Sequence, residues 1–72
     1  MKKLPVLSGH DIVVALQKLG FSVVGTRGSH VRLKKKTSEV RIVLVPLHKE
    51  VKKGTLKSIL RQAGIQAEEL KN

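Results

Sequence analysis

The sequence predicts an α+β fold in which two helices pack on one face of a three-stranded antiparallel sheet. Apolar residues recur at helical spacing near the beginning and near the end of the chain, and between them lies a segment that alternates apolar and cationic residues. Three short strands in succession favour an antiparallel meander. Two amphipathic helices and one sheet bury their apolar surfaces most simply with both helices on one sheet face.

The first helix is expected over residues 9–19. Ser8 is a favourable N-cap residue, and Asp11 stands three positions later, where the partner of a capping box belongs. Gly20 then supplies a residue that commonly ends a helix. The apolar stripe of this helix consists of Ile12, Ala15, Leu16 and Leu19.

Three strands are expected at residues 21–26, 30–34 and 40–45. A Gly-Ser pair separates the first two strands, and residues 35–39 contain no hydrophobic side chain and therefore form the second turn. Pro46 is expected to stop the third strand.

The middle strand alternates, so its two faces differ in chemistry. Val31 and Leu33 point to one face, as the two-residue period of a strand requires. The other face is then cationic and carries His30, Arg32 and Lys34.

A second helix is expected after Gly54, with Thr55 as its cap and Gly64 at its end. Residues 67–70 allow one further turn. The apolar stripe consists of Leu56, Ile59, Leu60 and Ala63.

The composition favours one small basic domain spanning residues 1–72. Fifteen Lys and Arg residues against five Asp and Glu residues give a formal net charge of +10. A chain this short encloses no deep cavity, so we expect a shallow surface site. The absence of cysteine fits a reducing cytoplasm. No apolar run approaches the roughly 20 residues of a membrane helix, so we expect no membrane partner.

The excess of positive charge points to a phosphate-rich partner, and nucleic acid is the first candidate. A solvated surface that merely keeps the protein soluble is the alternative. Phe21 is the sole aromatic residue, which argues against binding by stacking bases on aromatic platforms. Lys52, Lys53 and Thr55 lie at the expected start of the second helix, where free backbone N–H groups also favour a phosphate.

His30 is the candidate for chemistry, because alternation places its imidazole among cations. RNA cleavage without a metal needs a base for the 2′-hydroxyl, an acid for the departing oxygen, and cations for the extra charge on phosphorus. Histidine changes protonation near neutral pH and suits either proton-transfer role. His48 is a second candidate, whereas His10 is expected to be structural. The histidine and carboxylate spacing shows no metal-ligand set.

Several short motifs together resemble the HicA toxin family, small bacterial and archaeal mRNA interferases of toxin–antitoxin pairs. The resemblance covers about residues 7–70, and the combination of a Gly-Ser-His element with a Gly-Thr-Leu helix makes it specific. The motifs are Ser8-Gly9, Gly20-Phe21, Gly28-Ser29-His30, Val45-Pro46-Leu47-His48 and the segment from Gly54 to Gly64.

The resemblance implies a fold like that of double-stranded-RNA-binding domains, in the α-β-β-β-α order. It also implies the cytoplasmic toxin of a type II toxin–antitoxin system, active in stress response as a metal-independent and cofactor-free endoribonuclease that cleaves mRNA and inhibits translation. The catalytic histidine of the family falls on His30. Ser29, Arg32, Lys34, Lys52, Lys53 and Thr55 are the candidate RNA-binding residues, and a HicB-like antitoxin is the expected protein partner.

Two other functions suit the same fold. A non-catalytic double-stranded-RNA-binding module would recognise RNA shape and 2′-hydroxyl groups, and it has no need of an imidazole at His30. A protein-interaction module would dock another chain on the exposed sheet face, where we expect Val24, Val43 and Val45. The latter role is compatible with catalysis if the docked chain is the antitoxin.

Overall fold

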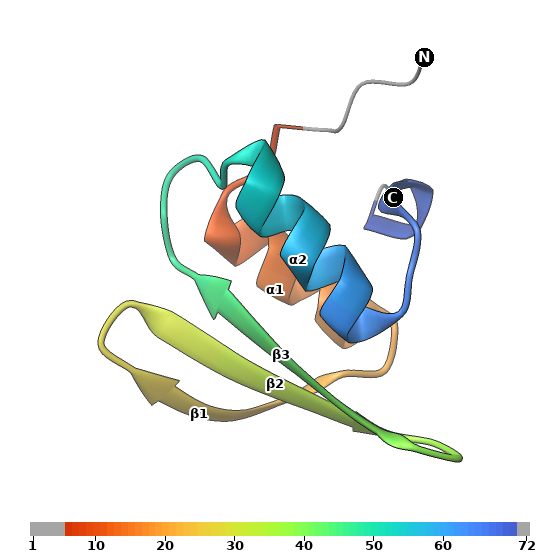
Figure 1. Ribbon diagram of the computed structural model, residues 1–72. Helices are drawn as coiled ribbons and strands as arrows, with labels where there is room; N and C mark the ends of the chain where they lie inside the picture. The colour runs from red at the N-terminus through yellow and green to blue at the C-terminus, as the bar shows by residue number, and fades with distance from the viewer. Residues whose placement is uncertain (1–5, 71–72) are drawn as a thin grey trace.

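The computed structural model describes residues 6–70 as an α-β-β-β-α arrangement with a short terminal 3-10 helix, in agreement with the order predicted from the sequence (Figure 1). The elements are α1 (Gly9–Lys18), β1 (Ser22–Arg27), β2 (His30–Lys36), β3 (Val40–Pro46), α2 (Lys53–Ala63) and η1 (Ala67–Leu70). The turn at residues 67–70 is the one that the sequence allowed.

The strands form one antiparallel sheet in the order β1-β2-β3, and both helices cover the same face of it (Figure 1). β2 pairs with β3 without irregularity. The pairing of β1 with β2 shifts between Val23 and Gly25, so Val24 is the extra residue of a β-bulge. The other sheet face is left open, as predicted.

One cluster of buried side chains joins the helices to the sheet. Leu33, Val43 and Val45 are completely buried in it, together with residues of both helical stripes. The prediction that Val43 and Val45 lie on the exposed face is therefore wrong. Leu33 pairs with Val43 and Val31 pairs with Val45, and directly paired residues share a face of the sheet. Val24 is exposed as predicted.

The two helices begin in different ways. α1 has the predicted capping box: the Ser8 hydroxyl accepts from the Asp11 backbone N–H at 3.0 Å, and the Asp11 carboxylate accepts from the Ser8 N–H at 3.3 Å. The predicted cap of α2 is wrong, because Thr55 lies inside the helix and the N-cap residue is Lys52, whose side chain makes no capping bond. Val51 is buried and donates its N–H to the Leu7 carbonyl at 2.8 Å, so tertiary packing determines where α2 starts.

Lys35 extends β2 past its predicted end and belongs to the helix side of the sheet. The strand continues to Lys36, so the turn before β3 is shorter than the sequence indicated. The Lys35 ammonium group donates to the Leu19 carbonyl at 2.7 Å and lies 5.7 Å from the centroid of the Phe21 ring. This side chain therefore ties the end of α1 to β2 and stabilises the last turn of the helix.

Gly9 allows the start of α1 to pack directly on the end of β3. A Cβ atom at this position would overlap the Pro46 carbonyl oxygen and lie 2.8 Å from Leu47 Cα. The Gly9 N–H also donates to the His48 carbonyl at 2.9 Å. The first turn of α1 therefore fixes the backbone that follows β3.

Replacing Gly9 with alanine should destabilise the protein, because the added methyl group requires the backbone at Pro46 to move. Overpacking of this kind costs about 1–3 kcal/mol. Urea unfolding followed by circular dichroism measures the loss. The exposed neighbour His10 provides the control, since H10A should change the free energy of unfolding by less than about 0.5 kcal/mol. Equal stability of G9A and the native protein would contradict this packing.

Candidate nucleic-acid interface

The open face of the sheet carries a shallow depression built from all three strands. Cationic side chains and His30 run along β2 in its centre, and mostly apolar residues of the neighbouring strands flank them. The three rows across the sheet are Arg27–His30–Pro46, Gly25–Arg32–Leu44 and Ser22–Lys34–Ile42. Except for Pro46 and Ser22, these residues line the depression, as does Val24.

A tight hairpin presents His30 at one end of this depression. Gly28 and Ser29 form the two-residue loop between β1 and β2, and Gly28 adopts a φ of 59°, which side chains rarely accept. The Ser29 carbonyl accepts from the Leu47 N–H at 2.6 Å, which joins this hairpin to the segment after β3. His30 is exposed, so its imidazole is open to a ligand.

The charged residues that line the depression are all cationic. None of its lining residues is acidic. Arg27 lies directly opposite His30, and Arg32 and Lys34 follow two and four positions along β2 on the same face. The ion pair of Arg41 with Glu39, at 2.8 Å, lies at the opposite end of β3 from the Pro46 row. Like charges on one face repel one another, and a bound phosphate chain would relieve that repulsion.

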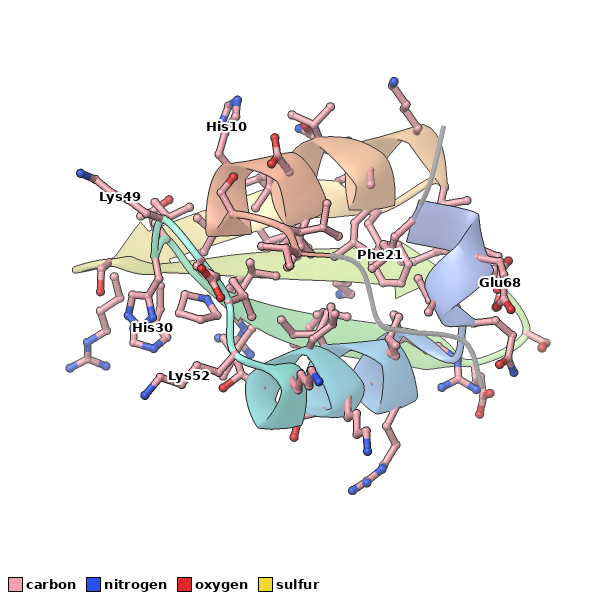
Figure 2. All side chains as sticks on the ribbon, turned by 90° about the horizontal axis from the view of Figure 1, so that it is seen from above. His10, Phe21, His30, Lys49, Lys52 and Glu68 are labelled. Atoms are coloured by element: carbon pink, nitrogen blue, oxygen red, sulfur yellow. The ribbon has the colours of Figure 1, made fainter. Side chains whose placement is uncertain are left out.

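The predicted RNA-binding residues fall into two groups. Arg32 and Lys34 share the depression with His30, whereas Lys52, Lys53 and Thr55 lie exposed at the start of α2, outside it. Ser29 contributes its carbonyl to the hairpin anchor. Figure 2 shows His30, Lys49 and Lys52 toward the same end of the molecule, but Lys52 begins the helix that covers the other face of the sheet (Figure 1).

The other two histidines do not line the depression. His48 supplies the backbone carbonyl that binds the Gly9 N–H, and its side chain is exposed. His10 lies in the first turn of α1 (Figure 2) and is also exposed.

Within residues 6–70, no three histidine or acidic side chains come close enough to form a metal-binding group. The helices described here include none that is long and apolar enough to cross a membrane.

Sequence reasoning missed several residues of this face. Ile42 and Leu44 were left unassigned because the face of a strand is known only once its register with β2 is known. Gly25 and Arg27 were missed because the bulge at Val24 interrupts the alternation of β1. The one available signal was the strict alternation of β2, which fixed the face correctly.

Fold and site together define a small α-β-β-β-α protein with a cationic, solvent-facing sheet that carries one histidine. Residues 9–65 match the model of a protein family described as the HicA toxin of bacterial toxin–antitoxin pairs. The chain therefore belongs to the HicA toxin family, and its role is that of a toxin with an antitoxin partner. Comparison with curated proteins gives no match.

Alanine at Gly28 should weaken the hairpin that presents His30. A side chain in the left-handed region costs about 1–2 kcal/mol, although nothing lies within 4 Å of the added carbon. Thermal unfolding measures this loss. Gly54, whose added carbon also meets no atom within 4 Å, is the matched control. Because Gly54 lies within α2 and has no positive φ, G54A should leave stability unchanged or raise it by up to about 1 kcal/mol. A stabilised G28A variant would contradict the turn geometry.

Proposed function

We propose that this toxin is an endoribonuclease that cleaves messenger RNA in the cytoplasm, with His30 as the proton-transfer group. The observation that carries the proposal is an exposed imidazole at one end of a cationic depression without acidic lining residues. Arg27 lies directly opposite His30, and Arg32 follows two residues later on the same face, about 7 Å along the strand. These groups suit a phosphodiester and the ribose attached to it.

The reaction is a transfer of the phosphoryl group to the neighbouring 2′-hydroxyl. His30 performs one of the two proton transfers, by removing the 2′ proton or by protonating the departing 5′-oxygen, and water performs the other. The 2′-oxygen forms a bond to phosphorus while the bond from phosphorus to the 5′-oxygen breaks, which leaves a 2′,3′-cyclic phosphate and a free 5′-hydroxyl. Arg32 and Lys34 stabilise the negative charge that accumulates on the phosphoryl oxygens. No step of this scheme requires a metal or cofactor.

The start of α2 supports the same substrate through phosphates away from the cleaved bond. Lys52 and Lys53 are exposed, and the first turn of α2 contains no acidic residue to compete for them. The free N–H groups and the positive end of the helix favour an anion at this place. We assign Lys52, Lys53 and the hydroxyl of Thr55 to binding the RNA backbone.

The antitoxin proposed for this chain is a HicB-like protein that covers the open sheet face. Val24, Ile42 and Leu44 are 54%, 42% and 49% exposed there, beside the cationic residues of β2. A partner that combines acidic and apolar side chains would bury the apolar flanks and neutralise the charge. Such a partner would block RNA and the imidazole together.

Substitution of His30 by alanine should abolish cleavage and relieve growth arrest on expression. Loss of acid–base catalysis lowers rates by about 10²–10⁴-fold. Cleavage of a synthetic RNA by purified protein measures the effect, and circular dichroism shows whether the variant folds. His48 provides the control: it is exposed outside the depression, and its structural contact uses only the backbone. H48A is expected to cleave at the native rate.

Undiminished cleavage by H30A would remove the assignment of His30. RNA that is bound by the native protein but never cut would favour the non-catalytic double-stranded-RNA-binding module instead. That alternative draws on the cations at the start of α2, which need no imidazole nearby.

Replacing Lys52 and Lys53 together with glutamine should weaken RNA binding without changing the reaction of bound RNA. Each lost phosphate contact reduces the slope of log affinity against log salt by about 0.7 for a single strand. We therefore expect a slope lower by about 1.4 and an unchanged single-turnover rate at saturating protein. The matched variant R32Q should lower that rate instead. An identical salt slope in K52Q/K53Q would show that RNA does not contact the start of α2.

A further inference from the structure

A gap in the outer face of the sheet lies next to His30. In the row Gly25–Arg32–Leu44, the β1 position has no side chain, and a Cβ added to Gly25 would meet no atom within 4 Å. Gly25 has no positive φ, so a side chain at this position would meet no left-handed backbone strain. Glycine weakens a strand, and in strands it often marks a place where a ligand approaches closely.

The borders of this gap are both apolar and cationic. The β-bulge adds Val24 beside Gly25, and its side chain is 54% exposed. Across the gap stands Arg32, whose aliphatic stem and charged end offer two kinds of contact. Both residues line the depression together with Gly25. A flat, largely apolar group with an attached anion fits these borders.

We propose that the gap over Gly25 is a slot for one unstacked nucleobase of the RNA. This inference rests on the proposed ribonuclease function and names the form of the substrate. The base lies on the Gly25 backbone between Val24 and the stem of Arg32, which leaves the guanidinium group free for the phosphate.

The position of the slot relative to His30 fits one nucleotide. Gly25 pairs with Arg32 and Arg27 pairs with His30, so Gly25 and His30 are diagonal neighbours on the same face. Diagonal neighbours are separated by about 7–8 Å, a distance that one nucleoside spans. A base in the slot therefore brings the 2′-hydroxyl of its own ribose toward the imidazole.

The slot selects single-stranded RNA, because a duplex keeps its bases paired and stacked. The slot also binds the base without stacking it on an aromatic side chain. Phe21, the sole aromatic residue of the chain, is only 3% exposed and lies in the core. Aliphatic and backbone surface at Gly25 takes the place of an aromatic platform.

Filling the slot tests the inference. We expect G25V to cleave single-stranded RNA at least tenfold more slowly than the native protein, and G25A to fall between the two. S22V is the matched control, since Ser22 lies on the same strand and the same face but outside the lining of the depression. Thermal unfolding verifies that each variant folds. If G25V does not fold, the smaller substitution G25A still tests the proposal.

A substrate lacking one base provides the second arm. The native protein first cuts a single-stranded RNA at a mapped bond, and the base on the 5′ side of that bond is then removed. We expect the native protein to cut the abasic RNA about tenfold more slowly than the intact RNA, and G25V to treat the two RNAs alike.

The outcomes separate the slot from the ribonuclease function. Cleavage by G25V at the native rate, or equal cleavage of duplex and single-stranded RNA, would overturn the proposed slot. If H30A is inactive in the same assay, the proposed ribonuclease function still stands. Full activity of H30A would refute the role of His30. The cleavage rates of G25V and of the abasic RNA would then still test whether a base binds over Gly25.

Discussion

The two-residue period of β2 is the constraint on which the rest of the structure depends, because this central strand supplies both the core and the candidate site. Leu33 is completely buried beneath the helices, whereas its neighbours Arg32 and Lys34 face solvent. A slip of one residue would expose the apolar side chains and bury unpaired charges, which is very costly. Core packing therefore keeps the cationic side chains of β2 on the solvent side of the sheet, and this determines which way the candidate site faces.

Backbone contacts, rather than functional side chains, build the end of the molecule where His30 lies. Ser29 binds Leu47 and His48 binds Gly9 through main-chain groups alone. The charged side chains at this end are therefore not needed for these contacts and are available to a ligand. Lys35 differs from these residues, because its ammonium group donates a hydrogen bond to the Leu19 carbonyl at the end of α1. A net charge of +10 on 72 residues is thus compatible with a stable fold, and RNA or an antitoxin would relieve the repulsion it creates.

Local patterns predicted the elements well, and their errors have a common origin. The capping box of Ser8 and the helix end at Gly64 were correct, because both depend on residues adjacent in the chain. Thr55 failed as a cap because burial of Val51 starts α2 earlier. The face of Val43 was wrong because it depends on pairing with β2, which alternation within one strand does not reveal. Errors therefore arose wherever a distant segment decided the outcome.

The sequence by itself determined the order of elements, the charge of the open face and the place of His30 on it, since periodicity, turn residues and alternation are local properties. Only the tertiary structure decided what surrounds that imidazole. The register brings Arg27 opposite it, the bulge at Val24 opens the gap at Gly25, and both result from pairing between strands. Pairing depends on how the whole core packs, and no single stretch of sequence records that.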